Sequence, residues 1–191
     1  MKQNKSLLWI FGLLILASSL YRVWDGRPWG FAPQIAMALF AGSVIKNKKF
    51  AFLVPVLSML FSDALYQVLY QQGLTPIKGF YSGQWINYTL VAMVTVIGFA
   101  IRKDRIAHIF AGSLAGVAFY FLASNFATWI GGGLDINNAP YPKTLSGLMT
   151  CYAAGVPFLK VSLWATLLFN GIFFGSHYLL TRKTAPAGSL S

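Results

Sequence analysis

The distribution of apolar residues constrains this chain more than any other feature of its sequence. Six apolar segments extend approximately over residues 6–24, 32–46, 50–71, 85–101, 106–130 and 159–181. An α-helix rises 1.5 Å per residue, so about 20 residues cross a hydrocarbon core of ~30 Å. Five segments approach or exceed that length, whereas the second, of about fifteen residues, must be tilted, capped by the loop before it, or only partly spanning. The sequence therefore predicts an all-α membrane protein with six transmembrane helices.

The composition excludes other classes of protein. Hydrophobic residues make up 57% of the chain and charged residues 10%, against about 25% charged in ordinary soluble domains. A soluble domain of this composition would expose large apolar patches, and one cysteine cannot form an intramolecular disulfide. We expect a single transmembrane domain over residues 1–183 and a polar cytoplasmic tail over residues 184–191. The apolar stretch Leu145–Phe158, interrupted by Gly and Pro, is predicted to form a short extra helix before the last span.

The basic residues predict the orientation in the membrane. The net charge is +11, and most of the basic residues fall into four clusters: Lys2 and Lys5; Lys46, Lys48 and Lys49; Arg102, Lys103 and Arg105; Arg182 and Lys183. With six spans all four clusters lie on one side, which the positive-inside rule makes cytoplasmic. We therefore expect a multi-pass protein of the bacterial inner membrane with both termini in the cytoplasm.

Two other interpretations of the basic residues are less favoured. The first segment resembles a signal peptide, but its apolar run continues to Trp24, so we favour a retained first helix. Nucleic-acid binding is not expected, because no basic stripe interleaves with exposed aromatic residues.

Asp63 is the one acidic residue well inside an apolar segment. A lipid-facing Asp is costly, so this side chain should face the bundle interior or a water-filled cavity. Tyr66 follows three residues later and shares its helical face. Two interpretations stay open: Asp63 is part of a ligand or ion site, or it is a hydrogen-bonding node that ties helices together, for example by pairing with a basic residue.

Further polar and aromatic residues gather at the predicted outer ends of the segments. The candidate substrate-binding residues are Gln34, Asp63, Tyr66, Asn87, Asn125, Trp129 and Tyr152. Such groups suit a largely uncharged ligand that contains a ring. Each of them alone could instead satisfy a loop, and the Trp residues could form an interfacial aromatic belt.

No catalytic or metal-binding pattern is recognisable. The chain has four acidic residues and two His, and we find no nucleophile–base pair, carboxylate pair or phosphate-binding glycine loop. No second Cys or nearby His completes a metal site with Cys151, which is better explained as a small buried hydrophobe. We therefore expect no enzymatic activity, no catalytic residues and no cofactor.

Small residues in the second segment predict close packing of helices. Ala36, Ala38 and Gly42 lie within one short stretch, and Ala38 and Gly42 are four residues apart. Such small residues let helix backbones approach closely, either within the bundle or against another membrane protein.

Several short stretches carry a family resemblance. The segment from Ala32 to Gly42 is similar to the Ala-rich helix of the S components of energy-coupling-factor (ECF) vitamin transporters. The chain resembles more closely an uncharacterised family of small bacterial membrane proteins thought to be related to S components. The matching stretches are 36–42, 46–55, 62–63, 124–129, 141–144, Gly147, 151–152 and 157–158, within Phe31–Gly175.

This resemblance implies a substrate-binding membrane subunit that captures a vitamin-like molecule at its outer face. It also implies a partner ATPase and scaffold module that docks on Ala36, Ala38 and Gly42. Some cobalamin-specific S components use a cysteine as a cobalt ligand, and only this comparison suggests such a role for Cys151. The alternative to uptake is a membrane scaffold or interaction protein of the cell envelope. A ligand-sized cavity beneath the outer loops would favour uptake over the scaffold.

Overall fold

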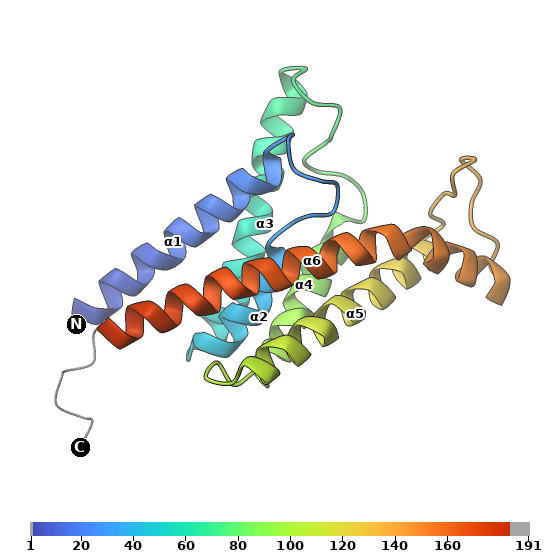
Figure 1. Cartoon of the computed structure of the whole chain (residues 1–191). Helices are drawn as coiled ribbons and strands as arrows, with labels where there is room; N and C mark the ends of the chain where they lie inside the picture. The colour runs from blue at the N-terminus through green and yellow to red at the C-terminus, as the bar shows by residue number, and fades with distance from the viewer. Residues whose placement is uncertain (1, 184–191) are drawn as a thin grey trace.

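The computed structural model describes the backbone of residues 2–183 and the side chains of residues 12–181. Its elements are α1 (Lys2–Val23), α2 (Gln34–Val44), α3 (Lys48–Gln71), α4 (Gln84–Gly98), α5 (Ile106–Ile130) and α6 (Leu145–Lys183). The helices form one bundle, from which the far ends of α3 and of the α5–α6 pair diverge (Figure 1). The predicted all-α fold is confirmed. The predicted tail, residues 184–191, lies outside the described residues.

Helix α2 is the centre of the bundle. It packs against α3, α4, α5 and α6, and every residue from Gln34 to Gly42 is buried. Its side chains form most of the hydrophobic core together with residues of α3, α4 and the end of α6. A helix that is apolar all round is stable only where neighbours surround it, so α2 is enclosed by protein.

Among the residues whose side chains the structure describes, three helices are long and apolar enough to cross a membrane: α3, α5 and α6. In α5 and α6 only 22% of the most apolar window is buried within the bundle, so most of their apolar surface is left for lipid. The chain is therefore a membrane protein. Helix α2, with 11 residues, is about 16 Å long at 1.5 Å per residue, and α4 has 15 residues. Both fall short of a full span, so six spanning helices are not established.

The last helix differs from the prediction. Residues 145–158 do not form a separate short helix, because they are continuous with the predicted last span in a single α6 of 39 residues. Pro157 lies inside this helix. The prediction was wrong because Gly and Pro usually interrupt helices, whereas membrane helices tolerate them where neighbouring elements satisfy the freed backbone groups.

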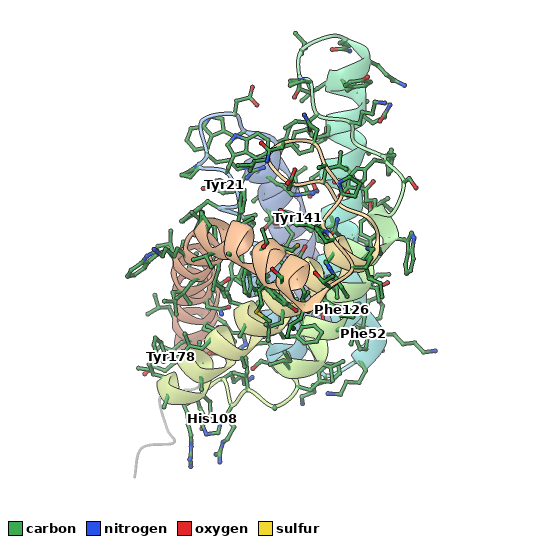
Figure 2. The ribbon with its side chains drawn as sticks, turned by 90° about the vertical axis from the view of Figure 1, so that its right-hand side faces the viewer. Tyr21, Phe52, His108, Phe126, Tyr141 and Tyr178 are labelled. Atoms are coloured by element: carbon green, nitrogen blue, oxygen red, sulfur yellow. The ribbon has the colours of Figure 1, made fainter. Side chains whose placement is uncertain are left out.

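The loops divide between two ends of the molecule. The basic loops after α2 and after α4 lie together, since the Ser43 hydroxyl donates to the Ile101 carbonyl at 3.0 Å. The start of α1 and the end of α6 lie at one end of the molecule in Figure 1. Figure 2 places His108 and Tyr178 toward that end and Tyr141 toward the other. This division matches the predicted clustering of the basic segments at one end of the molecule.

A close contact between glycines joins α2 to α4. A Cβ on Gly42 would lie 2.9 Å from the Cα atom of Gly98, and closer still to the Thr95 carbonyl oxygen. Ala36 and Ala38 are 0% exposed. The small residues of α2 therefore pack helices within the bundle and offer no free surface. The structure does not support a docking role for Ala36, Ala38 and Gly42, because other helices of the same chain occupy the face they would need.

Candidate functional site

The polar residues predicted from the sequence separate into two regions. The first surrounds Asp63, which lies in α3 and is 2% exposed. Its carboxylate forms an ion pair with Arg22 at the end of α1. It also accepts hydrogen bonds from the Gln84 amide and, at 2.6 Å, from the Tyr88 hydroxyl of α4. Through these contacts the carboxylate joins α1, α3 and α4. We call these four residues the Asp63 cluster.

Arg22 and Tyr66 extend this region toward the loop after α1. Arg22 also donates to the Ser62 hydroxyl at 2.5 Å. The Tyr66 hydroxyl donates to the Arg22 carbonyl at 2.7 Å and accepts from Arg27 at 3.1 Å. Tyr66 and Arg27 border a small surface hollow of about 60 Å³ with Trp24 and Trp29. Tyr66 is thus mainly a structural tie between α3 and the loop.

The second region is a cavity of about 200 Å³ between α2, α5 and α6. Its lining residues are Ile35 of α2; Val117, Tyr120, Phe121, Ser124 and Asn125 of α5; and Gly155, Phe158, Leu159 and Ser162 of α6. The walls are mainly apolar and aromatic, with a few polar groups. Ligand pockets commonly have this composition.

Asn125 is the candidate residue that the structure places in the cavity. Its amide nitrogen donates to the Phe121 carbonyl at 2.8 Å, which fixes the side chain on its own helix. The amide packs directly against Gly155 of α6, where a Cβ would lie 2.5 Å from Oδ1 of Asn125. Glycine at position 155 therefore provides the space in which the Asn125 amide lies.

Asn87 connects the two regions. Its amide nitrogen donates to the Tyr81 hydroxyl at 2.7 Å, and its Oδ1 accepts from Tyr120, a cavity residue, at 3.3 Å. The Tyr81 backbone N–H in turn donates to Gln84 at 3.2 Å. Asn87 does not line the cavity, but it holds the ring of Tyr120, which does.

Two candidates lie outside the cavity. The Trp129 indole donates to the Pro142 carbonyl at 2.8 Å, which ties the loop of residues 131–144 to α5. Lys143 adds a second tie by donating to the Trp129 carbonyl. The Tyr152 hydroxyl donates to the Leu122 carbonyl at 3.1 Å and joins α6 to α5. Both residues therefore stabilise the end of the α5–α6 pair.

Gln34 and Cys151 are buried. Gln34 is 6% exposed, and both of its amide atoms lack a hydrogen-bond partner among the described residues. The Cys151 thiol donates to the Asn125 carbonyl at 3.4 Å. Within residues 12–181, no group of three or more His, Cys, Asp or Glu side chains could hold a metal ion. Cys151 thus packs as a small buried residue behind the cavity wall.

Sequence analysis missed most of the cavity residues, although helical spacing could have indicated them. Val117, Tyr120, Phe121, Ser124 and Asn125 recur on one face of α5 at i, i+3, i+4, i+7 and i+8. Gly155, Phe158, Leu159 and Ser162 repeat the same spacing on α6. The α6 residues were hidden by the division of that helix into two segments.

The fold and this site define an all-α membrane protein with a small cavity between its helices. The chain belongs to a family of unknown function, DUF6580, whose profile matches residues 2–187. No curated protein and no solved structure gave a significant match.

Proposed function

We propose that the protein is an integral membrane substrate-binding protein that takes up a vitamin-like small molecule from the outer face. The observation that carries this proposal is the cavity between α2, α5 and α6, with Asn125 in its wall. The cavity lies at the same end of α5 as the loop 131–144, which we take as an outer loop. In this proposal the chain has six membrane segments and cytoplasmic termini, and lies in a bacterial inner membrane.

The size of the cavity limits the ligand. An engineered apolar cavity of about 150 Å³ is large enough to bind benzene, and this cavity measures about 200 Å³. Pockets for drug-sized ligands span roughly 300–1,000 Å³. The cavity therefore suits a molecule with one ring, or the ring of a larger molecule.

The loop between α1 and α2 contributes to the surroundings of the cavity. Gly30 adopts φ 78°, and a Cβ there would lie 3.5 Å from the Phe158 ring. Phe158 lines the cavity, so this loop passes directly beside its wall. In this proposal the ligand enters from the outer side beside this loop.

Active uptake would require a partner, and we propose an ATPase and scaffold module in that role. Because Ala36, Ala38 and Gly42 are buried, such a module would contact other helices. The exposed apolar faces of α5 and α6 are available, since Leu114, Leu122 and Leu168 are more than 40% exposed. A purely scaffolding function would use the same faces but would not need the cavity.

Native mass spectrometry of the protein extracted gently from its own host membrane tests the proposal. We expect a co-purifying small molecule on the wild type. The variant Asn125→Leu should lose it, because the variant keeps the side-chain size but removes the amide. The matched control Tyr152→Phe, which changes a residue outside the cavity on the same helix pair, should retain the molecule.

An apo mass for the wild type, or a bound molecule that survives Asn125→Leu, would contradict the proposal. A protein partner on an otherwise empty chain would favour the scaffold instead.

A further inference from the structure

We infer that the ligand of this cavity is a neutral, single-ring molecule that donates a hydrogen bond to Oδ1 of Asn125. The inference rests on the proposed function and specifies the chemistry of the ligand at the same site. It follows from three properties of the wall: its charge, its aromatic surface and the state of its hydrogen-bonding atoms.

The absence of charge in the wall makes the ligand neutral. None of the residues that line the cavity is Asp, Glu, Lys, Arg or His. Moving an ion from water into such surroundings without a partner charge is strongly unfavourable. The acid of the bundle, Asp63, is already paired with Arg22 and lies outside the lining. A charged ligand would therefore find no partner here.

The aromatic residues make a ring the best-matched shape. Tyr120, Phe121 and Phe158 contribute rings from two helices, and aromatic pairs gain from offset or edge-to-face contact beyond the area that they bury. The Tyr120 hydroxyl is held by Asn87 at 3.3 Å, so this ring is fixed before any ligand arrives.

The donors of the wall are largely engaged, and one acceptor is free. The Ser124 hydroxyl and the Asn125 amide nitrogen both donate to the Phe121 carbonyl, at 3.3 Å and 2.8 Å, and the Tyr120 hydroxyl donates to Asn87. Among the described residues no donor reaches Oδ1 of Asn125. Because an acceptor that a ligand covers without pairing loses its contact with solvent and gains no hydrogen bond in return, a ligand that donates to Oδ1 is favoured over one that only accepts.

The Ser162 hydroxyl does not alter this preference. It makes no hydrogen bond with another described residue and can donate or accept as its ligand requires. Asn125 therefore sets the specificity, and Gly155 is a positioning residue that keeps the space for its amide.

A matched pair of probes tests the inference. We would measure binding of 4-fluorobenzamide and methyl 4-fluorobenzoate to the full chain in nanodiscs by fluorine NMR, with empty nanodiscs as the blank. The two probes share a fluorinated ring and a carbonyl, but only the amide carries N–H donors. We expect the wild type to bind the amide at least tenfold more tightly than the ester.

Two variants locate the origin of this preference. Asn125→Leu should reduce the ratio of affinities to near one, because no acceptor remains. Gly155→Ala should also reduce it, because the new Cβ displaces the Asn125 amide while the amide itself is kept. Gly155→Ala also tests the inference if Asn125→Leu fails to fold. The control Tyr152→Phe should leave the ratio unchanged.

Equal binding of the two probes to the wild type, or binding of neither, would overturn the inference. A preference for the amide over the ester that both Asn125→Leu and Gly155→Ala retain would also overturn it. The native mass measurement separates these failures from failure of the proposed function. A co-purified molecule that Asn125→Leu removes would leave uptake standing even if the ligand is not a donor.

Discussion

The Asp63 cluster and the cavity are both polar regions inside an apolar bundle, but they differ in how their hydrogen bonds are satisfied. In the Asp63 cluster the carboxylate has an ion pair and two hydrogen-bond donors from its own chain. In the cavity the Asn125 amide is held through its nitrogen and lies in the space left by Gly155, while its oxygen accepts no hydrogen bond from another described residue. The Asp63 carboxylate therefore has its hydrogen-bonding partners within the chain, whereas Oδ1 of Asn125 has none among the described residues.

This difference shows why charge alone is a poor guide to function in a membrane bundle. An intramembrane acid attracts attention because it is costly, yet the same cost favours the partners that neutralise it. Breaking a buried ion pair leaves an uncompensated charge, so the contacts of Asp63 favour a structural role. A neutral amide can be left partly unpaired at a smaller cost in free energy, and it can therefore form a hydrogen bond with a ligand.

The largest effect is expected from Asp63→Ala. It leaves Arg22 without its counter-ion and should lower the free energy of unfolding by about 3 kcal/mol, toward the low end of buried pairs because Arg22 retains 22% side-chain exposure. Thermal unfolding in detergent measures the loss. The double variant with Arg22→Met should recover part of it. An unchanged melting temperature in Asp63→Ala would contradict the structural role.

A pair of glycine substitutions sharpens the comparison. Gly42→Ala places its Cβ against the backbone of α4 and should cost about 2 kcal/mol, as over-packed cores typically do. In Gly155→Ala the atoms nearest the new Cβ belong to the end of the Asn125 side chain and not to backbone. This variant should change stability by less than about 1 kcal/mol, since Ala favours helix. Chemical unfolding of the two variants side by side measures both. Equal losses would mean that the cavity wall is as rigid as the core.

Trp129→Phe tests whether the hydrogen bond between Trp129 and the loop of residues 131–144 is independent of ligand binding in the cavity. The variant loses the hydrogen bond to Pro142 and should cost about 1 kcal/mol. Limited proteolysis should show faster cleavage within residues 131–144, while the co-purifying molecule remains bound. Loss of that molecule would place Trp129 back among the binding residues.

The smallest effect concerns the pH dependence of the same loop. Backbone N–H groups of Ala139 and Asn137 donate to the Asp135 carboxylate at 3.0 Å and 2.8 Å and hold its pKa below the usual value. Since the folded pKa is depressed, the stabilisation is present above the unfolded pKa of about 3.9 and is lost as the pH falls through the folded pKa.

NMR of the Asn137 and Ala139 amide protons should show their downfield shifts decreasing only in that acidic range. The variant Asp135→Asn should remove this titration. A transition near neutral pH would contradict the assignment.

The sequence predicted much of the fold because the apolar segments are long and well separated. Five of the six helices fall close to predicted segments. The error at Leu145–Phe158 arose because local composition cannot show that neighbouring elements support a helix through Pro157. The predicted six spans are shown only in part for the same kind of reason, since α2 is apolar by virtue of burial in protein rather than contact with lipid.

The candidate site was less predictable. Residue types alone left Asp63 open between ligand site and structural node, and only the contacts with Arg22, Gln84 and Tyr88 distinguish these interpretations. Asn125 was identified because it is a polar residue at the predicted outer end of its apolar segment. Gly155 and Ser162 carry no such signal, and their importance depends on the pairing of α5 with α6.

The most direct test of the account is an experimental structure of the protein purified from its own membrane, at a resolution that shows bound small molecules. The account predicts density for a ring-sized molecule between Tyr120, Asn125 and Phe158, with the Arg22–Asp63 pair intact and unliganded. An empty cavity together with a ligand bound at Asp63 would contradict it.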